Sequence, residues 1–152
     1  MSATGLRPLA TDQEQVRYWQ RHTWTGVALC LVLPLVIVID TALEPAGAEP
    51  RRWALYLGAG LVAALSPLLL LVPVGRVVRH RLGRLFFDTW EALGVVLVTT
   101  FALLDGGARS PCIMFFYVLL AHAALAYPPL GMLIAGVGNV AGYLTVALVA
   151  VT

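Results

Sequence analysis

Among the residues whose type could support chemistry, His122 has the most unusual position. It lies near the middle of a long apolar run, 111–127. An imidazole there could bind a small ligand, a haem iron or a quinone, or it could sense pH. The simpler interpretation is a neutral histidine that donates one interhelical hydrogen bond, worth about 0.6–2 kcal/mol in a membrane. Haem would require a second ligand, and no second histidine is expected at mid-membrane depth. We predict no cofactor and no metal, and we keep His122 as a candidate sensing residue.

Three further polar residues lie within apolar runs. Asp88 and Glu91 are three residues apart, so a helix would place both on one face. Asp88 can pair with Arg84, whereas Glu91 has no basic residue one helical turn away. The pair could reach the headgroups as interface acids, or Glu91 could pair across helices or stay protonated. Asn139 is a candidate hydrogen-bond partner for Glu91 or His122.

A short polar segment separates two of the apolar runs and contains the residues Asp105, Gly106, Gly107, Ala108, Arg109, Ser110 and Pro111. The two glycines permit backbone angles that other residues avoid. Ser110 and Pro111 are typical of a helix start, as cap and first residue. One interpretation is a tight hairpin between antiparallel helices. The other is a periplasm-facing mouth for a small ligand, with Asp105 and Arg109 as its polar groups.

The composition shows what must position these residues. Of the 152 residues, 60% are hydrophobic and only 12% are charged, against about 25% charged residues in a soluble domain. This excludes an ordinary soluble globule, a disordered chain and a nucleic-acid binder. Because the apolar runs are continuous and long enough to cross a bilayer, they predict an all-α, polytopic transmembrane bundle of five helices. The expected helices are 24–43, 53–74, 86–104, 111–127 and 130–151, which form one sensory or anchoring domain, 23–152, after an N-terminal segment, 1–22.

The ten basic residues are all arginines, and their distribution predicts the orientation. Seven lie in segment 1–22 and in the linker between the second and third helices, and three lie on the other side of the membrane. The N-terminus is therefore expected in the cytoplasm and the C-terminal end outside, in a bacterial inner membrane. The linker arginines Arg76, Arg79, Arg81 and Arg84 are expected to lie on a short amphipathic segment at the headgroups, as an interface anchor or as a lipid or partner sensor.

Small residues and prolines add local expectations. Gly138 and Gly142 have the spacing that lets helices approach closely, within the bundle first and in a homodimer second. Pro34, Pro67 and Pro73 are expected to bend their helices. The sequence contains no nucleophile with a base, no phosphate loop and no metal-ligand set, so we expect no catalysis by this chain.

The loop and the helix that follows it resemble a known membrane region. Gly106 to Pro111, the aromatic run Phe115-Phe116-Tyr117, and the segment 123–129 are similar to the N-terminal sensor region of actinobacterial GGDEF-type diguanylate cyclases. Multi-span sensor histidine kinases have similar loops. The resemblance extends over about residues 20–152, and its specific matches lie within about 105–143.

The resemblance implies about six helices that precede a cytoplasmic catalytic domain. This chain has no GGDEF motif and no phosphoacceptor helix, so a sixth helix is expected beyond Thr152 if an output domain follows. In redox-sensing kinases the corresponding loop is associated with quinone binding, but Ser110 here replaces the asparagine of that pattern. The implied function is to relay a membrane or periplasmic signal to an attached cyclase or, alternatively, a kinase.

Two other functions remain open from the sequence. A small transporter or channel would need polar groups along a path across the bilayer, and only His122, Asn139 and Glu91 qualify. A passive membrane subunit would need no internal polar site. The expected partners are the lipid bilayer, a second copy of the chain and a small-molecule ligand, and no nucleic acid.

Overall fold

The protein is an all-α bundle, as the composition predicts. The computed structural model describes residues 12–43, 49–80, 83–127 and 129–149, and no strand occurs among them. The α-helices are α1 (Asp12–Leu43), α2 (Glu49–Leu65), α3 (Val74–Arg79), α4 (Gly83–Leu104), α5 (Met114–Ala126) and α6 (Pro129–Val149). Three short 3₁₀-helices are η1 (Ser66–Leu71), η2 (Gly107–Arg109) and η3 (Pro111–Ile113).

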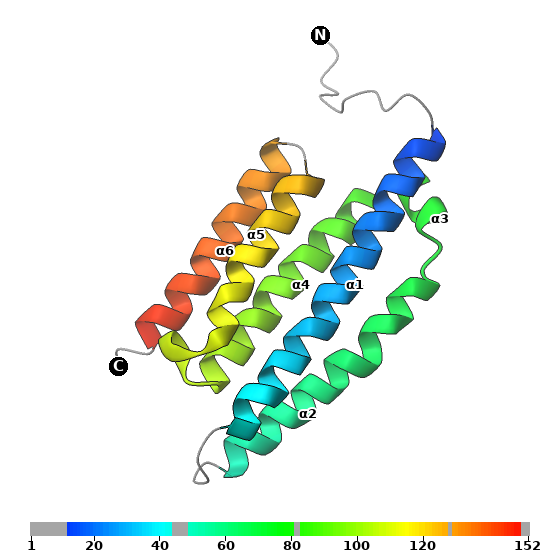
Figure 1. Ribbon diagram of the computed structural model, residues 1–152. Helices are drawn as coiled ribbons and strands as arrows, with labels where there is room; N and C mark the ends of the chain where they lie inside the picture. The colour runs from blue at the N-terminus through cyan, green and yellow to red at the C-terminus, as the bar shows by residue number, and fades with distance from the viewer. Residues whose placement is uncertain (1–11, 44–48, 81–82, 128, 150–152) are drawn as a thin grey trace.

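The long helices run side by side and alternate in direction (Figure 1). α2 packs against α1, α4 lies at the centre, and α6 packs against both α4 and α5. The short helix α3 lies beside the first turns of α1. The start of α1 and the end of α6 therefore lie at opposite ends of the bundle, which agrees with five passes.

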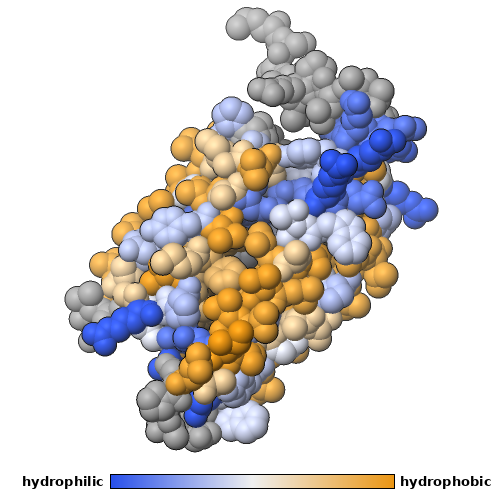
Figure 2. Space-filling view, in the orientation of Figure 1, coloured by the Kyte–Doolittle hydropathy of each residue, from blue (hydrophilic) through white to orange (hydrophobic). Residues whose placement is uncertain are grey.

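The apolar surface identifies a multi-pass membrane protein. Four helical stretches are long and apolar enough to cross a bilayer: Gln13–Leu43, Arg51–Leu71, Leu85–Leu104 and Pro129–Val149. A fifth, Pro111–Ala126, is apolar but shorter. On the face shown in Figure 2, hydrophobic residues cover the middle of the molecule, and hydrophilic residues gather toward its two ends. Large apolar side chains that would be buried in a soluble protein are exposed along this band and suit a lipid environment.

Two helices differ from the sequence-based prediction. α1 begins at Asp12 rather than near Trp24, so half of the segment 1–22 is helical. The second run changes from α-helix to 3₁₀-helix at Ser66, because Pro67 has no amide hydrogen to donate and the Ser66 hydroxyl donates to the carbonyl of Val62. Pro34, in contrast, lies within a continuous α1.

Close helix packing depends on glycines at two positions. A Cβ atom added at Gly142 on α6 would lie 2.7 Å from Thr99 Oγ1 and 2.8 Å from Phe116 Cε1. A Cβ atom added at Gly58 on α2 would lie 2.9 Å from Phe101 of α4. Gly138 has open space around it, so of the two glycines with helix-packing spacing only Gly142 serves packing within the bundle.

Candidate functional site

Two ionisable side chains are buried in the interior of the bundle. Glu91 of α4 has 5% of its surface exposed, and His122 of α5 has 7%. Both are one to two helical turns from the end of the bundle where α1 begins. The sequence predicted both as candidate sites, and the structure places them on adjacent helices.

His22 of α1 joins this pair, which the sequence analysis did not expect. Its ring stacks on the ring of His122 with centroids 3.9 Å apart and planes 14° apart. No second histidine was expected beside His122, but the helix α1 begins before Trp24 and brings His22 into contact with it near one end of the bundle. The two rings face each other flat, so their nitrogens do not point at a common metal position between them.

Aromatic residues surround the histidine pair and close this end of the bundle. Trp19 stacks on Phe87 with ring centroids 4.1 Å apart, and both lie beside His22. Tyr127 donates a hydrogen bond to the carbonyl of Phe87 at 2.8 Å, and Tyr18 donates to the carbonyl of Leu125. These bonds connect α1 and α4 to the end of α5.

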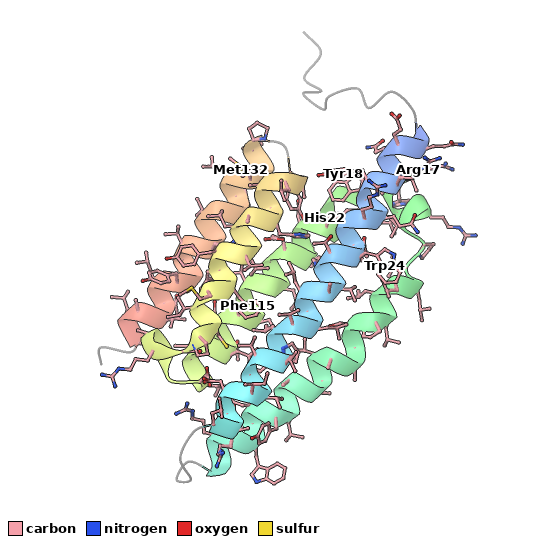
Figure 3. The ribbon with its side chains drawn as sticks, in the orientation of Figure 1. Arg17, Tyr18, His22, Trp24, Phe115 and Met132 are labelled. Carbon is pink, nitrogen blue, oxygen red and sulfur yellow. The ribbon has the colours of Figure 1, made fainter. Side chains whose placement is uncertain are left out.

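A narrow groove leads from the polar residues along α1, α4 and α5. Its polar end is formed by Trp90, Glu91 and His122, and its other lining is apolar, including Leu29, Leu97, Phe115 and Leu119. The cavity volume is about 40 Å³, enough for one or two water molecules. In Figure 3, His22 extends from α1 toward α5, and Phe115 lies further along the same groove.

Gly26 of α1 keeps the polar end of the groove open. A Cβ atom there would lie 3.4 Å from Trp90 Nε1 and 3.8 Å from His122 Nε2. A larger side chain would therefore occupy the space between these two nitrogen atoms. Gly26 is a position that the sequence alone did not single out, because an isolated glycine in an apolar helix has no distinctive pattern.

Two buried polar atoms of this site have no hydrogen-bond partner among the described residues: Glu91 Oε1 and His122 Nε2. Such atoms are rare in folded proteins, because each costs about 1–3 kcal/mol of unmade hydrogen bonding. A protonation change, a side-chain rotation or a small hydrogen-bonding ligand would satisfy them. The group Glu91, His122 and His22 is named here the polar centre.

Asp105, predicted as part of a ligand-receiving mouth, is instead held inside the protein. Its side chain has no exposed surface and lies 3.9 Å from Arg51 of α2. Ser110 donates its hydroxyl hydrogen to Asp105 and accepts one from the amide of Cys112 at 3.0 Å. This network connects the loop to the start of α2, which favours the structural hairpin over the mouth.

The remaining loop residues fit the same interpretation. Gly106 and Gly107 have positive φ angles, 107° and 67°, that favour glycine. Ser110 caps η3, which begins at Pro111 as the sequence predicts. Arg109 is exposed, whereas the Asp105 carboxylate is buried and faces Arg51.

Asn139 does not join the polar centre. It is buried on α6, and its amide donates to the carbonyl of Ala135 on the same helix at 2.9 Å. Its side-chain oxygen has no partner among the described residues. The predicted hydrogen bond with His122 or Glu91 is therefore not formed.

Two of the predicted interface arginines, Arg76 and Arg79, lie at the end of the bundle where α1 begins. Arg76 and Arg79 are exposed on α3. Arg81 and the side chain of Arg84 lie outside the described residues, so the predicted pairing of Arg84 with Asp88 falls there too. Among the described residues, no group of three histidine, cysteine or acidic side chains could hold a metal ion.

His22 could have been found from one signal in the sequence. Tyr18, Trp19 and His22 recur at helical spacing in an otherwise polar stretch, which indicates a helix face that packs against a partner. Comparison of the chain with protein families, with curated proteins and with solved structures finds no match to any of them.

Proposed function

We propose that this chain is the membrane-embedded sensory and anchoring region of a bacterial signal-transduction protein. The polar centre carries the proposal. It combines two buried ionisable side chains, an unmade hydrogen bond on each, and a stacked histidine from a third helix. Such a centre is sensitive to protonation or to a small hydrogen-bonding ligand, and it lies where three helices meet.

A signal at this centre would act on the contact between α1 and α5. When one ring of a flat histidine stack gains a proton, its charge faces the other ring at 3.9 Å. A second proton would place two like charges together, which is strongly unfavourable. The stack is therefore stable when neutral or singly charged and unstable when doubly charged, and a switch would couple this change of charge to a shift of α1 against α5. Glu91, Tyr18 and Tyr127 are the other titratable groups around the stack.

The arrangement is less suited to transport. The polar centre lies near one end of the bundle, and the groove that leads from it is lined by apolar side chains. Asn139 is bonded to its own helix and does not extend a polar path. A transport pathway needs polar groups along its length.

We also propose the inner membrane as the location, with α3 and the start of α1 in the cytoplasm. The support is the excess of arginines at that end. The attached output domain is proposed to be a diguanylate cyclase or, alternatively, a histidine kinase, on the resemblance of the loop and α5 to those sensor regions. A GGDEF or kinase domain encoded after Thr152 would support this.

The sensory function is tested by distance measurement between spin labels. Labels at Arg17→Cys on α1 and Met132→Cys on α6 (Figure 3), without the native cysteines, would be measured in lipid nanodiscs at pH 8 and pH 4. We expect the distance to change by roughly 1–2 Å or more, the usual size of a helix shift in switching proteins. The change should disappear in a His22→Phe, His122→Phe variant, which keeps two stacked rings but cannot be protonated there.

Two results would contradict the proposal. The first is that the distance between the labels is the same at both pH values and is also unchanged in the Gly26→Leu variant, in which the leucine fills the groove. This result would indicate a passive anchor. Gly60→Leu is the matched control for that variant, because Gly60 has open space around it. Proton or solute flux in liposomes that depends on Glu91 and His122 would indicate a transporter instead.

A further inference from the structure

The basic surface formed by α3 and the first turns of α1 is separate from the polar centre. Arg76 and Arg79 project from α3, and Arg17 lies at the start of α1 beside it (Figure 3). In Figure 2 this corner is the most hydrophilic part of the visible face. The structure gives no salt bridge to any of these three arginines within the described residues. Their charge is available to an anion.

Two hollows meet at this surface. The first, of about 530 Å³, is lined by Gly75, Arg76, Arg79 and His80. The second, of about 200 Å³, lies between α1 and η1 and is lined mainly by apolar groups, including Trp24, Leu70 and Val72. Pro73 and Gly75 line both hollows, so the basic one lies directly beside the apolar one.

The local sequence explains why the two hollows lie beside each other. The backbone turns to an extended conformation at Val72, and Pro73 precedes α3, which directs α3 away from the line of η1. Gly75 faces α1, because a Cβ there would be in van der Waals contact with Val16 at 3.6 Å. Both hollows consequently lie at the end of the apolar stretch Arg51–Leu71, and the apolar hollow is the one that reaches its last residues at Leu70.

We propose that these two hollows bind one anionic phospholipid. Its phosphate would lie between Arg76 and Arg79, whose planar guanidinium groups suit phosphate oxygens. The beginning of one acyl chain would lie between Trp24 and Leu70. Trp24 is 57% exposed at this depth, where amphipathic aromatic rings contact the headgroup boundary. A soluble phosphate would use only the basic hollow, whereas a phospholipid uses both.

The test measures lipid binding to the full chain in mild detergent by native mass spectrometry. Phosphatidylglycerol, phosphatidylcholine of equal chain length, and soluble glycerol phosphate would be compared. We expect phosphatidylglycerol to bind best. Its affinity should fall roughly thirty-fold in Arg76→Ala, Arg79→Ala, the effect of two arginines near an anionic surface. A double lysine variant at these positions should retain most of the affinity, because it keeps the charge.

The apolar hollow and the specificity need their own controls. Trp24→Ala should weaken phosphatidylglycerol binding and leave glycerol phosphate binding unchanged. Arg109→Ala removes an exposed arginine at the opposite end of the bundle and should leave both unchanged. The proposal would be overturned if Arg109→Ala lowered the affinity for phosphatidylglycerol as much as the double alanine variant does. It would also be overturned if phosphatidylcholine or glycerol phosphate bound as tightly as phosphatidylglycerol. Helical circular dichroism of each variant verifies that it is folded.

Discussion

At the scale of single residues, Asp105 shows how a charged group is used within the apolar bundle. Its carboxylate is fully buried, accepts a hydrogen bond from Ser110 and lies close to Arg51. Ser110 in turn caps the segment that leads into α5. One side chain therefore connects the loop, the start of α2 and the start of η3. Because Arg51 remains partly exposed, the hydrogen bonds around Asp105 contribute more than the ion pair.

Replacement of Asp105 by alanine should destabilise the protein by about 1–3 kcal/mol, because Ser110 loses its buried acceptor. Asp105→Asn should cost less, because the amide oxygen can still accept that hydrogen bond. Arg109→Ala, in the same loop but exposed, should change stability by less than about 0.5 kcal/mol. Unfolding in mild detergent, followed by circular dichroism, measures all three. Equal stability of the alanine variants at 105 and 109 would contradict the network.

At the scale of elements, the sequence predicted the helices better than their ends. Apolar length predicted five helices, of which four are long enough to cross a bilayer and the fourth in order, Pro111–Ala126, is shorter, and Pro111 and Ser110 located the start of that helix. The start of α1 was missed because its first turns are polar and carry only an aromatic stripe. That error concealed His22, and with it half of the histidine stack. Contacts such as His22 with His122 depend on packing between distant segments, which periodicity does not reveal.

Gly142 and Gly138 provide a matched pair for testing helix packing. Gly142→Ala should destabilise the protein by about 1–3 kcal/mol, because its Cβ would overlap Thr99 and Phe116. Gly138→Ala meets nothing within 4 Å and should be neutral or should stabilise α6 by up to about 1 kcal/mol, because alanine favours helix. The same detergent unfolding measurement compares them. A larger loss at Gly138 than at Gly142 would argue against this packing of α6 on α4.

At the scale of the whole molecule, the alternation of the helices fixes which segments share a side of the membrane. α3 lies at one end of the bundle, and η2 lies at the other. The arginine excess at the α3 end then predicts the orientation in the cell.

Single cysteines at Arg79 and Arg109, in a chain without Cys30 and Cys112, test this orientation. In intact spheroplasts an impermeant maleimide should label position 109 and should label position 79 only after the membrane is permeabilised. Both positions are exposed, so labelling depends on the side of the membrane. The reverse pattern would invert the proposed topology. Labelling of positions 79 and 109 from outside would place both on one side of the membrane and would contradict a single crossing by α4 between them.

The short α5 has a consequence for the surrounding lipid. The stretch Pro111–Ala126 combines a three-residue 3₁₀ turn with thirteen α-helical residues, so it rises roughly 25 Å, less than a bilayer core of about 30 Å. Met114 and Leu125, near its two ends, are both exposed. A helix this short is accommodated by local thinning of the bilayer, by flanking polar side chains that reach the headgroups, or by association with other helices. Hydrophobic mismatch of this kind favours thin membranes and makes the bundle responsive to bilayer thickness.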